Sequence, residues 1–293
     1  MDLTRLSLEQ LSAGLRQGSW SVADLVRRCE ENHQRHEPLL QAYKTWDGKG
    51  AADTAVLADQ LLAHGVDLGP LMGLPVSIKD LFAVRGLPTF AGSIAALGPD
   101  WEQPGPLVAG LERQLVPVMG KTHTVEFAFG GIGANAHWGT PRNPWKTEEH
   151  RIPGGSSSGA GVSLAQGSAV LALGTDTAGS VRIPASVTGQ VGLKPTHGRW
   201  PQAGIVPLSP SLDSPGILAR SVEDLVFAFR AIEQSLGRVP ASIAPPEAMS
   251  GLRLGRVDAF FLDDADAAVT QVYEQAMQRL QVLGAGVRGL ELP

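Results

Sequence analysis

Short apolar runs of strand length alternate along this chain with longer amphipathic segments of helical period. Strand-like runs cover residues 74–79, 116–119 and 169–173, and helix-like segments cover residues 106–115 and 221–234. Strands that alternate with helices favour an α/β sandwich, in which helices cover both faces of a central sheet. We therefore expect an α/β fold.

The N-terminal part of the chain predicts helices. Ser7 precedes one apolar-periodic segment, and Ser21 and Asp24 have the spacing of a capping box before a second one. A third helix is predicted over residues 51–63, where it ends before His64 and a glycine.

The C-terminal part begins after a segment rich in Pro and Ala, residues 237–251, which predicts a surface connection. A strand at 252–257, a helix at 263–283 and a last strand at 287–292 are predicted to follow. We expect one domain over residues 1–293, made of a helical part (1–66), a core (67–235) and a further part (252–293).

Composition excludes several classes of protein. Hydrophobic residues make up 43% of the chain and charged residues 18%, which suits a folded protein. The net charge is −5 without a basic block, so binding to nucleic acid through phosphate contacts is not expected. Cys29 is the only cysteine, which excludes an intrachain disulfide and a cysteine-rich metal site. The chain has no signal-like N-terminus and no apolar run of about 18 residues, so we expect a cytoplasmic protein away from membranes.

Two segments rich in Gly and Ser, residues 153–161 and 172–184, carry the densest chemical signal. A flexible linker is the plain alternative, but apolar strand and helix patterns flank both segments closely. The first segment also fits the G-x-S-x-G elbow of α/β-hydrolases, with Ser157 at its centre. That elbow must follow a buried strand, and residues 149–153 do not read as one.

The loop before the first of these segments is also informative. Residues 127–158 are dominated by Gly, Asn, Pro and Ser. A loop of this length in a compact domain is usually functional.

The order and spacing of these segments resemble the amidase signature family over about residues 5 to 235. The matching segments are Leu74-Pro-Val-Ser-Ile-Lys79-Asp80, Gly120-Lys-Thr122, Gly139-Thr-Pro-Arg-Asn-Pro144, Gly154-Gly-Ser-Ser-Ser-Gly159, Gly174-Thr-Asp-Thr-Ala-Gly-Ser180, Arg182-Ile-Pro-Ala-Ser186, Gly192-Leu-Lys-Pro-Thr196 and Ser211-Leu-Asp213. The resemblance implies a mixed central sheet covered by helices on both faces. It implies no metal and no organic cofactor.

In that family a lysine, a serine that follows a cis peptide bond and a second serine form the catalytic set. The resemblance places this set at Lys79, Ser156 and Ser180, with Ser180 as the nucleophile. It also places the segment Phe129-Gly130-Gly131 beside the substrate.

Elementary chemistry agrees with these roles. A serine hydroxyl is a weak nucleophile and needs a neighbouring base. A free lysine has a pKa of about 10.4, but burial can lower that of Lys79 to roughly 7–8. Ser156 would then relay a proton between Ser180 and Lys79. The alternative for Lys79 is a salt bridge to a carboxylate such as Asp80.

The turn before Ser180 offers consecutive backbone N–H groups at Thr177, Ala178 and Gly179. Such groups at a predicted helix start can hold a developing oxyanion. We expect Asp176 and Arg182 to brace this turn. Ala178 stands where the family usually has glycine.

The resemblance implies hydrolysis of a small-molecule carboxamide through an acyl-Ser180 intermediate. One alternative is the A subunit of a tRNA-dependent amidotransferase, which takes ammonia from glutamine and needs partner subunits. Another is a non-catalytic binding or assembly protein.

Family members continue beyond the length of this chain, and its last predicted strand resembles an interior strand of their sheet. We therefore expect the C-terminal part of the fold to be lacking. If the chain is a natural short form, its exposed sheet edge would need covering, for example by self-association into a homo-oligomer.

Overall fold

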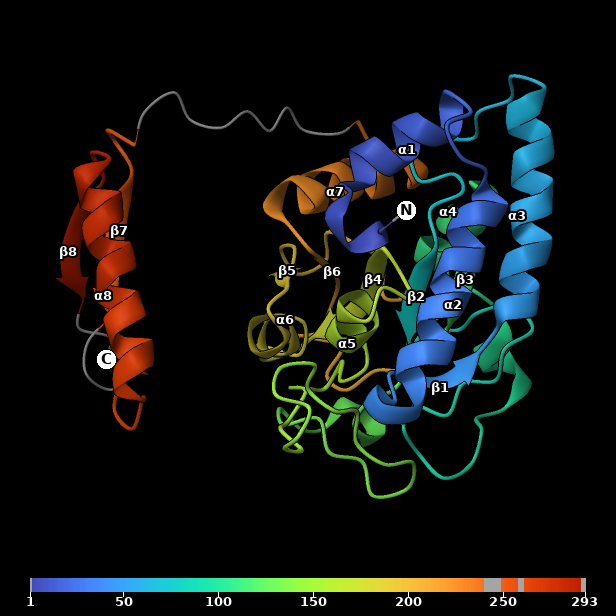
Figure 1. Cartoon of the computed structure of the whole chain (residues 1–293). Helices are drawn as coiled ribbons and strands as arrows, with labels where there is room; N and C mark the ends of the chain where they lie inside the picture. The colour runs from blue at the N-terminus through green and yellow to red at the C-terminus, as the bar shows by residue number, and fades with distance from the viewer. Residues whose placement is uncertain (1, 240–248, 258–260, 291–293) are drawn as a thin grey trace. The chain divides into compact units, whose positions relative to one another are not determined.

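The computed structural model describes residues 2–239, 249–257 and 261–290. The chain forms two compact units, Met1–Ala241 and Ser242–Pro293 (Figure 1). The expectation that both units belong to one domain stays a prediction.

The larger unit is built on a six-stranded sheet with strand order β1-β3-β2-β4-β6-β5. Strands β3, β2 and β4 run parallel, whereas β1 is antiparallel to β3, β6 to β4, and β5 to β6. The sheet is therefore mixed, as predicted. Its strands are β1 (Tyr43–Trp46), β2 (Val76–Lys79), β3 (Val118–Thr122), β4 (Leu171–Asp176), β5 (Val191–Leu193) and β6 (Ser214–Ala219).

Two of the N-terminal helices begin at capping boxes. Ser7 accepts from the N–H of Gln10, and Ser21 accepts from the N–H of Asp24, which confirms both predicted helix starts. The α-helices of this unit are α1 (Leu8–Arg16), α2 (Val22–Leu40), α3 (Gly48–Ala63), α4 (Pro106–Arg113), α5 (Ala160–Ala165), α6 (Arg182–Thr188) and α7 (Val222–Ser235). Short 3-10 helices lie at η1 (Leu3–Arg5), η2 (Pro99–Glu102) and η3 (Glu126–Ala128).

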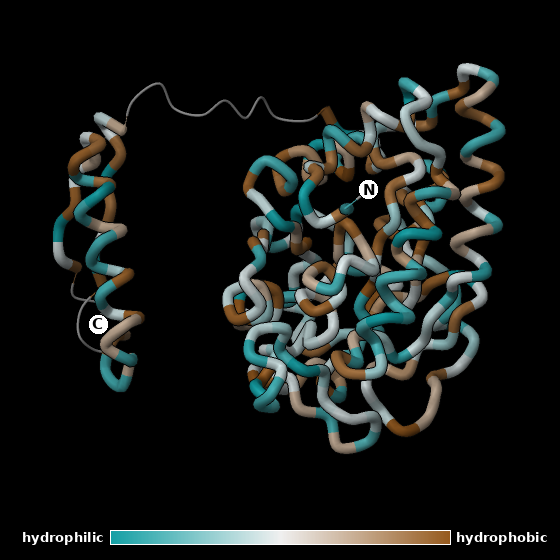
Figure 2. Tube along the Cα trace, in the orientation of Figure 1, coloured by the Kyte–Doolittle hydropathy of each residue, from teal (hydrophilic) through white to brown (hydrophobic). Residues whose placement is uncertain are grey.

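Helices cover both faces of the sheet. In β4, Leu171 and Leu173 belong to a large core cluster that includes Ile232 of α7, whereas Ala172 belongs to a second cluster with Leu164 of α5. Successive side chains of a strand point to opposite faces, so α5 and α7 lie on opposite sides of the sheet. Figure 2 shows hydrophilic and hydrophobic residues alternating along the outer helices, as amphipathic helices require.

The ends of several elements differ from prediction. Strand β4 continues to Asp176 rather than ending at Gly174, because Gly174 to Asp176 pair with residues 214–216 of β6. Strand β3 begins at Val118, two residues later than predicted. Strands β1, β5 and β6 were not predicted. Helix α6 begins just after the turn at 177–180, where a helix start was predicted, although its extent was not.

The smaller unit is a strand-helix-strand arrangement. Strands β7 (Arg253–Val257) and β8 (Gly286–Leu290) pair in parallel, and α8 (Ala267–Val282) connects them. The predicted order is confirmed, with α8 starting four residues later than expected. The end of the predicted last strand, and most of the connection predicted at 237–251, lie outside the described residues.

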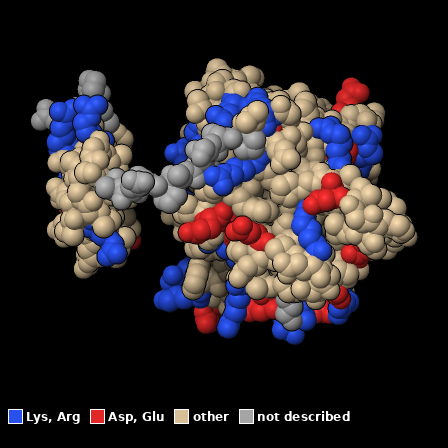
Figure 3. Space-filling model, turned by 90° about the horizontal axis from the view of Figure 1, so that it is seen from above, with Lys and Arg blue, Asp and Glu red and all other residues tan. Residues whose placement is uncertain are grey.

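Within the described ranges, no helix is both long and apolar enough to cross a membrane. On the face of the larger unit seen in Figure 3, basic and acidic side chains are interspersed among uncharged ones.

Candidate active site

Lys79 ends β2, in the interior of the sheet, with β3 on one side and β4 on the other. Two residues earlier, the hydroxyl of Ser77 lies 2.8 Å from that of Ser163 in α5. Because residues i and i+2 of a strand share a face, Lys79 points to the same side as Ser77. Its side chain is completely buried.

Two hydroxyl groups contact the amine of Lys79. Its Nζ lies 2.7 Å from Ser156 Oγ and 2.8 Å from Thr175 Oγ1. Burial lowers the pKa of Lys79 to about 7, although the charges of Asp176 and Asp213 oppose this shift. About half of an amine with this pKa is neutral at pH 7, and only the neutral form can act as a base.

The alternative assignment, an ion pair between Lys79 and Asp80, is wrong. Asp80 instead pairs with Lys121, with 3.0 Å between Lys121 Nζ and Asp80 Oδ1. The sheet register explains this choice, because Lys121 stands beside Ile78, on the face to which Asp80 also points.

The serine loop, residues 154–159, runs beside Lys79. The peptide bond between Gly155 and Ser156 is cis, as the resemblance implied. The N–H of Gly155 donates to Gly131 O at 2.7 Å. A Cβ at position 155 would lie only 2.7 Å from the nitrogen of Gly133, so this position requires glycine.

Ser156 and Ser157 are both buried but have different partners. The hydroxyl of Ser156 accepts from Lys79, whereas that of Ser157 donates to the carbonyl of Thr175 at 3.3 Å. Ser157 is thus engaged with backbone, which agrees with the rejection of an elbow centred on it.

Strand β4 leads directly into residues 176–180, which we call the catalytic turn after the role predicted for Ser180. Asp176 accepts from the N–H groups of Gly179 at 2.7 Å and Val181 at 3.2 Å. Its oxygens also accept from the guanidinium of Arg182, with Arg182 Nη2 at 2.9 Å. This confirms that Asp176 and Arg182 brace the turn.

Ser180 lies at the end of the turn with 8% of its surface exposed. Its carbonyl accepts from the N–H of Ser157 at 3.3 Å, which joins the turn to the serine loop. Among the hydrogen bonds of the described residues, none links Ser180 Oγ to Ser156 Oγ. Catalytic hydrogen bonds are often long before substrate binds.

The three predicted oxyanion donors differ in their bonding. The N–H of Gly179 already donates to Asp176, because that carboxylate caps the turn. Within the described part of the chain, no hydrogen bond uses the N–H of Thr177 or Ala178. These two groups therefore remain as candidate donors.

The segment at Phe129, Gly130 and Gly131 adjoins the serine loop through the bond from Gly155 to Gly131. Phe129 is 82% exposed. Just before it, Phe127 and Ala128 have φ of 45° and 62°, values that few residues other than glycine adopt. Contact of this segment with a substrate stays a prediction.

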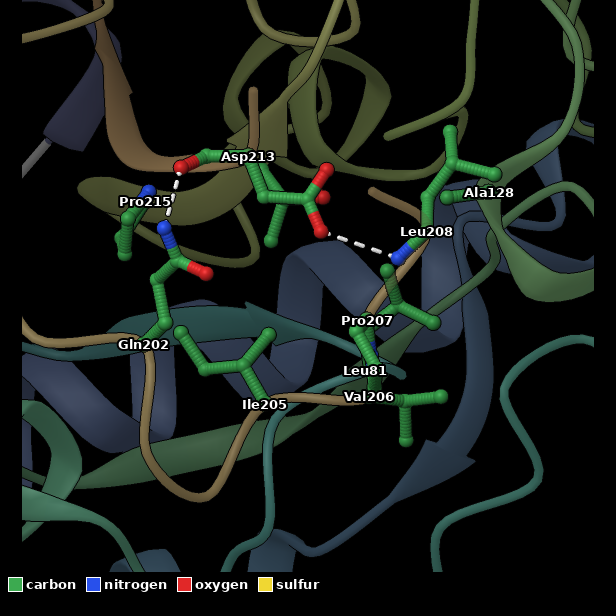
Figure 4. Close-up of a pocket in the computed structure, with 10 residues that line it drawn as sticks. Leu81, Ala128, Gln202, Ile205, Val206, Pro207, Leu208, Asp213 and Pro215 are labelled. Atoms are coloured by element: carbon green, nitrogen blue, oxygen red, sulfur yellow. Dashed lines mark hydrogen bonds between the residues drawn. The ribbon is translucent and has the colours of Figure 1, made fainter. Parts of the chain in front are cut away.

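A narrow pocket lies near Lys79, and Figure 4 shows most of the residues that line it. Thr175 belongs to its wall and is also a hydrogen-bond partner of Lys79 Nζ. Asp213 and Gln202 supply polar groups, and the other lining residues are mainly apolar: Leu81, Ala128, Ile205, Val206, Pro207, Leu208 and Pro215. Thr175 belongs to the same motif as Ser180, but no role was predicted for it from the sequence.

Comparisons with known proteins agree with this geometry. The Amidase family model matches residues 24–293. The chain is 58% identical over 293 residues to 2-amino-5-chloromuconic acid deaminase of Comamonas testosteroni, covering 100% of this chain and 63% of that protein. It is 37% identical over 304 residues to the A subunit of the glutamyl-tRNA(Gln) amidotransferase of Acidothermus cellulolyticus, covering 100% of this chain and 59% of that protein.

Solved structures show the same likeness. The peptide amidase of Stenotrophomonas maltophilia superposes with a TM-score of 0.83 at 30% identity, covering 99% of this chain and 62% of that one. Another amidase superposes with a TM-score of 0.87 at 34% identity, covering 98% of this chain and 64% of that one. The chain thus spans about three fifths of the length of these relatives. It belongs to the amidase family.

Proposed function

We propose that the protein hydrolyses a small molecule at a carbon–nitrogen bond of carboxamide type, releasing ammonia or an amine through an acyl-Ser180 intermediate. The observation that carries this proposal is the completely buried amine of Lys79, 2.7 Å from Ser156 Oγ. A buried lysine that is partly neutral near pH 7 and bonded to a serine hydroxyl is a base with a proton relay beside it.

The first step forms the acyl-enzyme. Ser180 Oγ attacks the carbonyl carbon and gives its proton to Ser156 Oγ, while the proton of Ser156 passes to Lys79 Nζ. Thr175 Oγ1, at 2.8 Å, accepts a hydrogen bond from the same amine, so the lone pair of the neutral nitrogen can face the hydroxyl of Ser156. A hydroxyl suits the relay because it donates and accepts at once.

The tetrahedral intermediate carries a negative oxygen that needs donors. The N–H groups of Thr177 and Ala178 are the candidates, because Asp176 already holds that of Gly179. A well-placed donor of this kind is typically worth about 10²–10³-fold in rate. Collapse of the intermediate expels the amine, which takes up the proton held by Lys79. Water then hydrolyses the acyl-enzyme by the same relay.

The relatives narrow the chemistry of the substrate. The Comamonas protein is named as a deaminase of 2-amino-5-chloromuconic acid, which is a small molecule. At 58% identity it supports a small substrate and ammonia as the product for this protein too. The amino group of that acid is attached to a carbon–carbon double bond and not to an acyl carbon, so its release would not pass through acyl-Ser180.

The test is ammonia release, measured with a panel of small carboxamides and, separately, with 2-amino-5-chloromuconic acid. Release from a carboxamide supports the proposal, whereas release from that acid alone would contradict an acyl-Ser180 intermediate. Activity should rise with pH through about 7, because Lys79 acts in its neutral form and its pKa is about 7. The Lys79→Ala and Lys79→Arg variants should both be inactive, since a guanidinium stays protonated. Near-normal turnover in Lys79→Arg would show that Lys79 is not the base.

A second candidate is the ammonia-producing A subunit of an amidotransferase, which the 37% identity to the Acidothermus protein favours. That function would use glutamine as the amide and would need partner subunits. Ammonia release from glutamine that exceeds release from every other amide in the panel would support this function instead.

A further inference from the structure

The register of strands β4 and β6 brings Asp213 beside the catalytic turn. Asp176 pairs with Ser214 in this antiparallel ladder, so the residues that follow and precede them, Thr177 and Asp213, stand opposite each other. Asp213 is 8% exposed, and its carboxylate is shared between the turn and the pocket wall.

Three donors use the two carboxylate oxygens of Asp213. The hydroxyl of Thr177 donates to Oδ1, while the N–H groups of Leu208 and Ser209 each donate to Oδ2 at 2.9 Å. The bond to Leu208 is drawn in Figure 4. The backbone of Asp213 is held as well, because Gln202 Nε2 donates to its carbonyl at 2.7 Å.

We propose that Asp213 is a positioning residue that acts through the hydroxyl of Thr177 to fix the catalytic turn against the pocket wall. The inference rests on the proposed function, in which the N–H of Thr177 is an oxyanion donor. A donor aids catalysis only when it is held where the oxyanion develops. The hydrogen bond from the hydroxyl of Thr177 to Asp213 can hold the N–H of Thr177 in that position.

The charge of Asp213 has a second effect at the same site. It favours the protonated form of Lys79 and therefore raises the pKa of that amine against the opposite effect of burial. Replacing Asp213 with asparagine removes the negative charge, so Lys79 should lose its proton at lower pH. The remaining carboxylates near Lys79 keep their ion pairs in such a variant: Asp176 with Arg182, and Asp80 with Lys121.

The test measures how fast a fluorophosphonate probe modifies Ser180, as a function of pH, because this readout needs no known substrate. The variants are Thr177→Val, Asp213→Asn and their double mutant, with Thr177→Ser as the control that keeps the hydroxyl. Each of the first two should label about 10- to 100-fold more slowly than the wild type, and Thr177→Ser close to the wild-type rate.

Two results would be specific to a positioning role. An asparagine has one amide oxygen, which the N–H groups of Leu208 and Ser209 occupy, so Asp213→Asn removes the bond that Thr177 donates. The double mutant should therefore label no more slowly than Asp213→Asn alone. The pH midpoint of labelling should move down in Asp213→Asn and stay unchanged in Thr177→Val. If Asp213 only stabilised the fold, the rate losses of the two single mutants would multiply in the double mutant, and the pH midpoint of labelling would not shift.

Other outcomes separate this inference from the proposed function. Suppose the wild type is labelled at Ser180 and the rate losses of the two single mutants multiply in the double mutant. That result would overturn the positioning role of Asp213 but not the proposed function. An unimpaired Thr177→Val variant would do the same even if Asp213→Asn failed to fold. Absence of labelling at Ser180 in the wild type would overturn both.

Discussion

The carboxylate of Asp80 lies 3.0 Å from Nζ of Lys121, and each side chain is at most 1% exposed. The two residues next to each other in the chain, Lys79 and Asp80, therefore have separate partners. Lys79 is left with hydroxyl groups as its hydrogen-bond partners. A bonded carboxylate would favour the charged amine, whereas burial among hydroxyls favours the neutral one.

Loss of Lys121 should destabilise the larger unit strongly. Lys121→Met leaves a buried carboxylate without its cation, which typically costs about 3–5 kcal/mol of unfolding free energy. The Asp80→Asn/Lys121→Met double mutant should recover much of that loss, because no unpaired charge remains. Urea unfolding followed by tryptophan fluorescence measures this, and equal stability of the single and double mutants would argue against the ion pair. The probe reports on the larger unit, which holds all six tryptophans: Trp20, Trp46, Trp101, Trp138, Trp145 and Trp200.

Stability should depend on pH through Lys79. Its folded-state pKa is about 7, below the ordinary value of 10.5, so between these values the unfolded chain binds more protons than the folded one. Stability therefore rises with pH in this window, by about 2 kcal/mol between pH 7 and pH 9. The full penalty of charging the buried amine is present below pH 7.

The matched control is Lys79→Met, which removes the titrating group and keeps most of the side-chain volume. Urea unfolding of both proteins at pH 7 and pH 9 should show the extra gain in the wild type alone. The same gain in both proteins would mean that other groups cause it.

Thr175 should matter for turnover through its hydroxyl. Thr175→Val keeps the shape of the side chain but removes one of the two hydrogen-bond partners of Lys79 Nζ. A hydrogen bond of about 1.4 kcal/mol corresponds to a tenfold effect, so kcat should fall about tenfold. Thr175→Ser, which keeps the hydroxyl, should retain most of the activity. Equal rates of ammonia release by the valine and serine variants would rule out this role.

Local signals predicted the helices better than the strands. Ser7 and Ser21 each form a capping box with a residue three positions later, so the local sequence is enough to locate both helix starts. Strand β6 contains Pro215 and Gly216, which argue against a strand when read locally. It forms because it pairs with β4, from which it is separated by about 40 residues, and no local pattern reports that pairing.

The same distinction holds for the site. The resemblance assigned Lys79, Ser156 and Ser180 from the apolar run and the Gly-Ser motifs that contain them, and their catalytic roles stay predictions. The contact between Lys79 and Thr175 crosses from β2 to β4, and the partner of Asp80 lies on β3. Those assignments depend on strand order, which the sequence pattern did not determine.

The most direct test of the proposed mechanism is to find which serine becomes acylated. The protein is reacted with an activated ester, digested with trypsin and analysed by mass spectrometry. One tryptic peptide, residues 152–182, contains Ser156, Ser157 and Ser180 together, so fragment ions must locate the added group. The mechanism predicts an acyl group on Ser180 that is absent from the Ser180→Ala variant. An acyl group on Ser157, or one that persists at full level in Ser180→Ala, would contradict it.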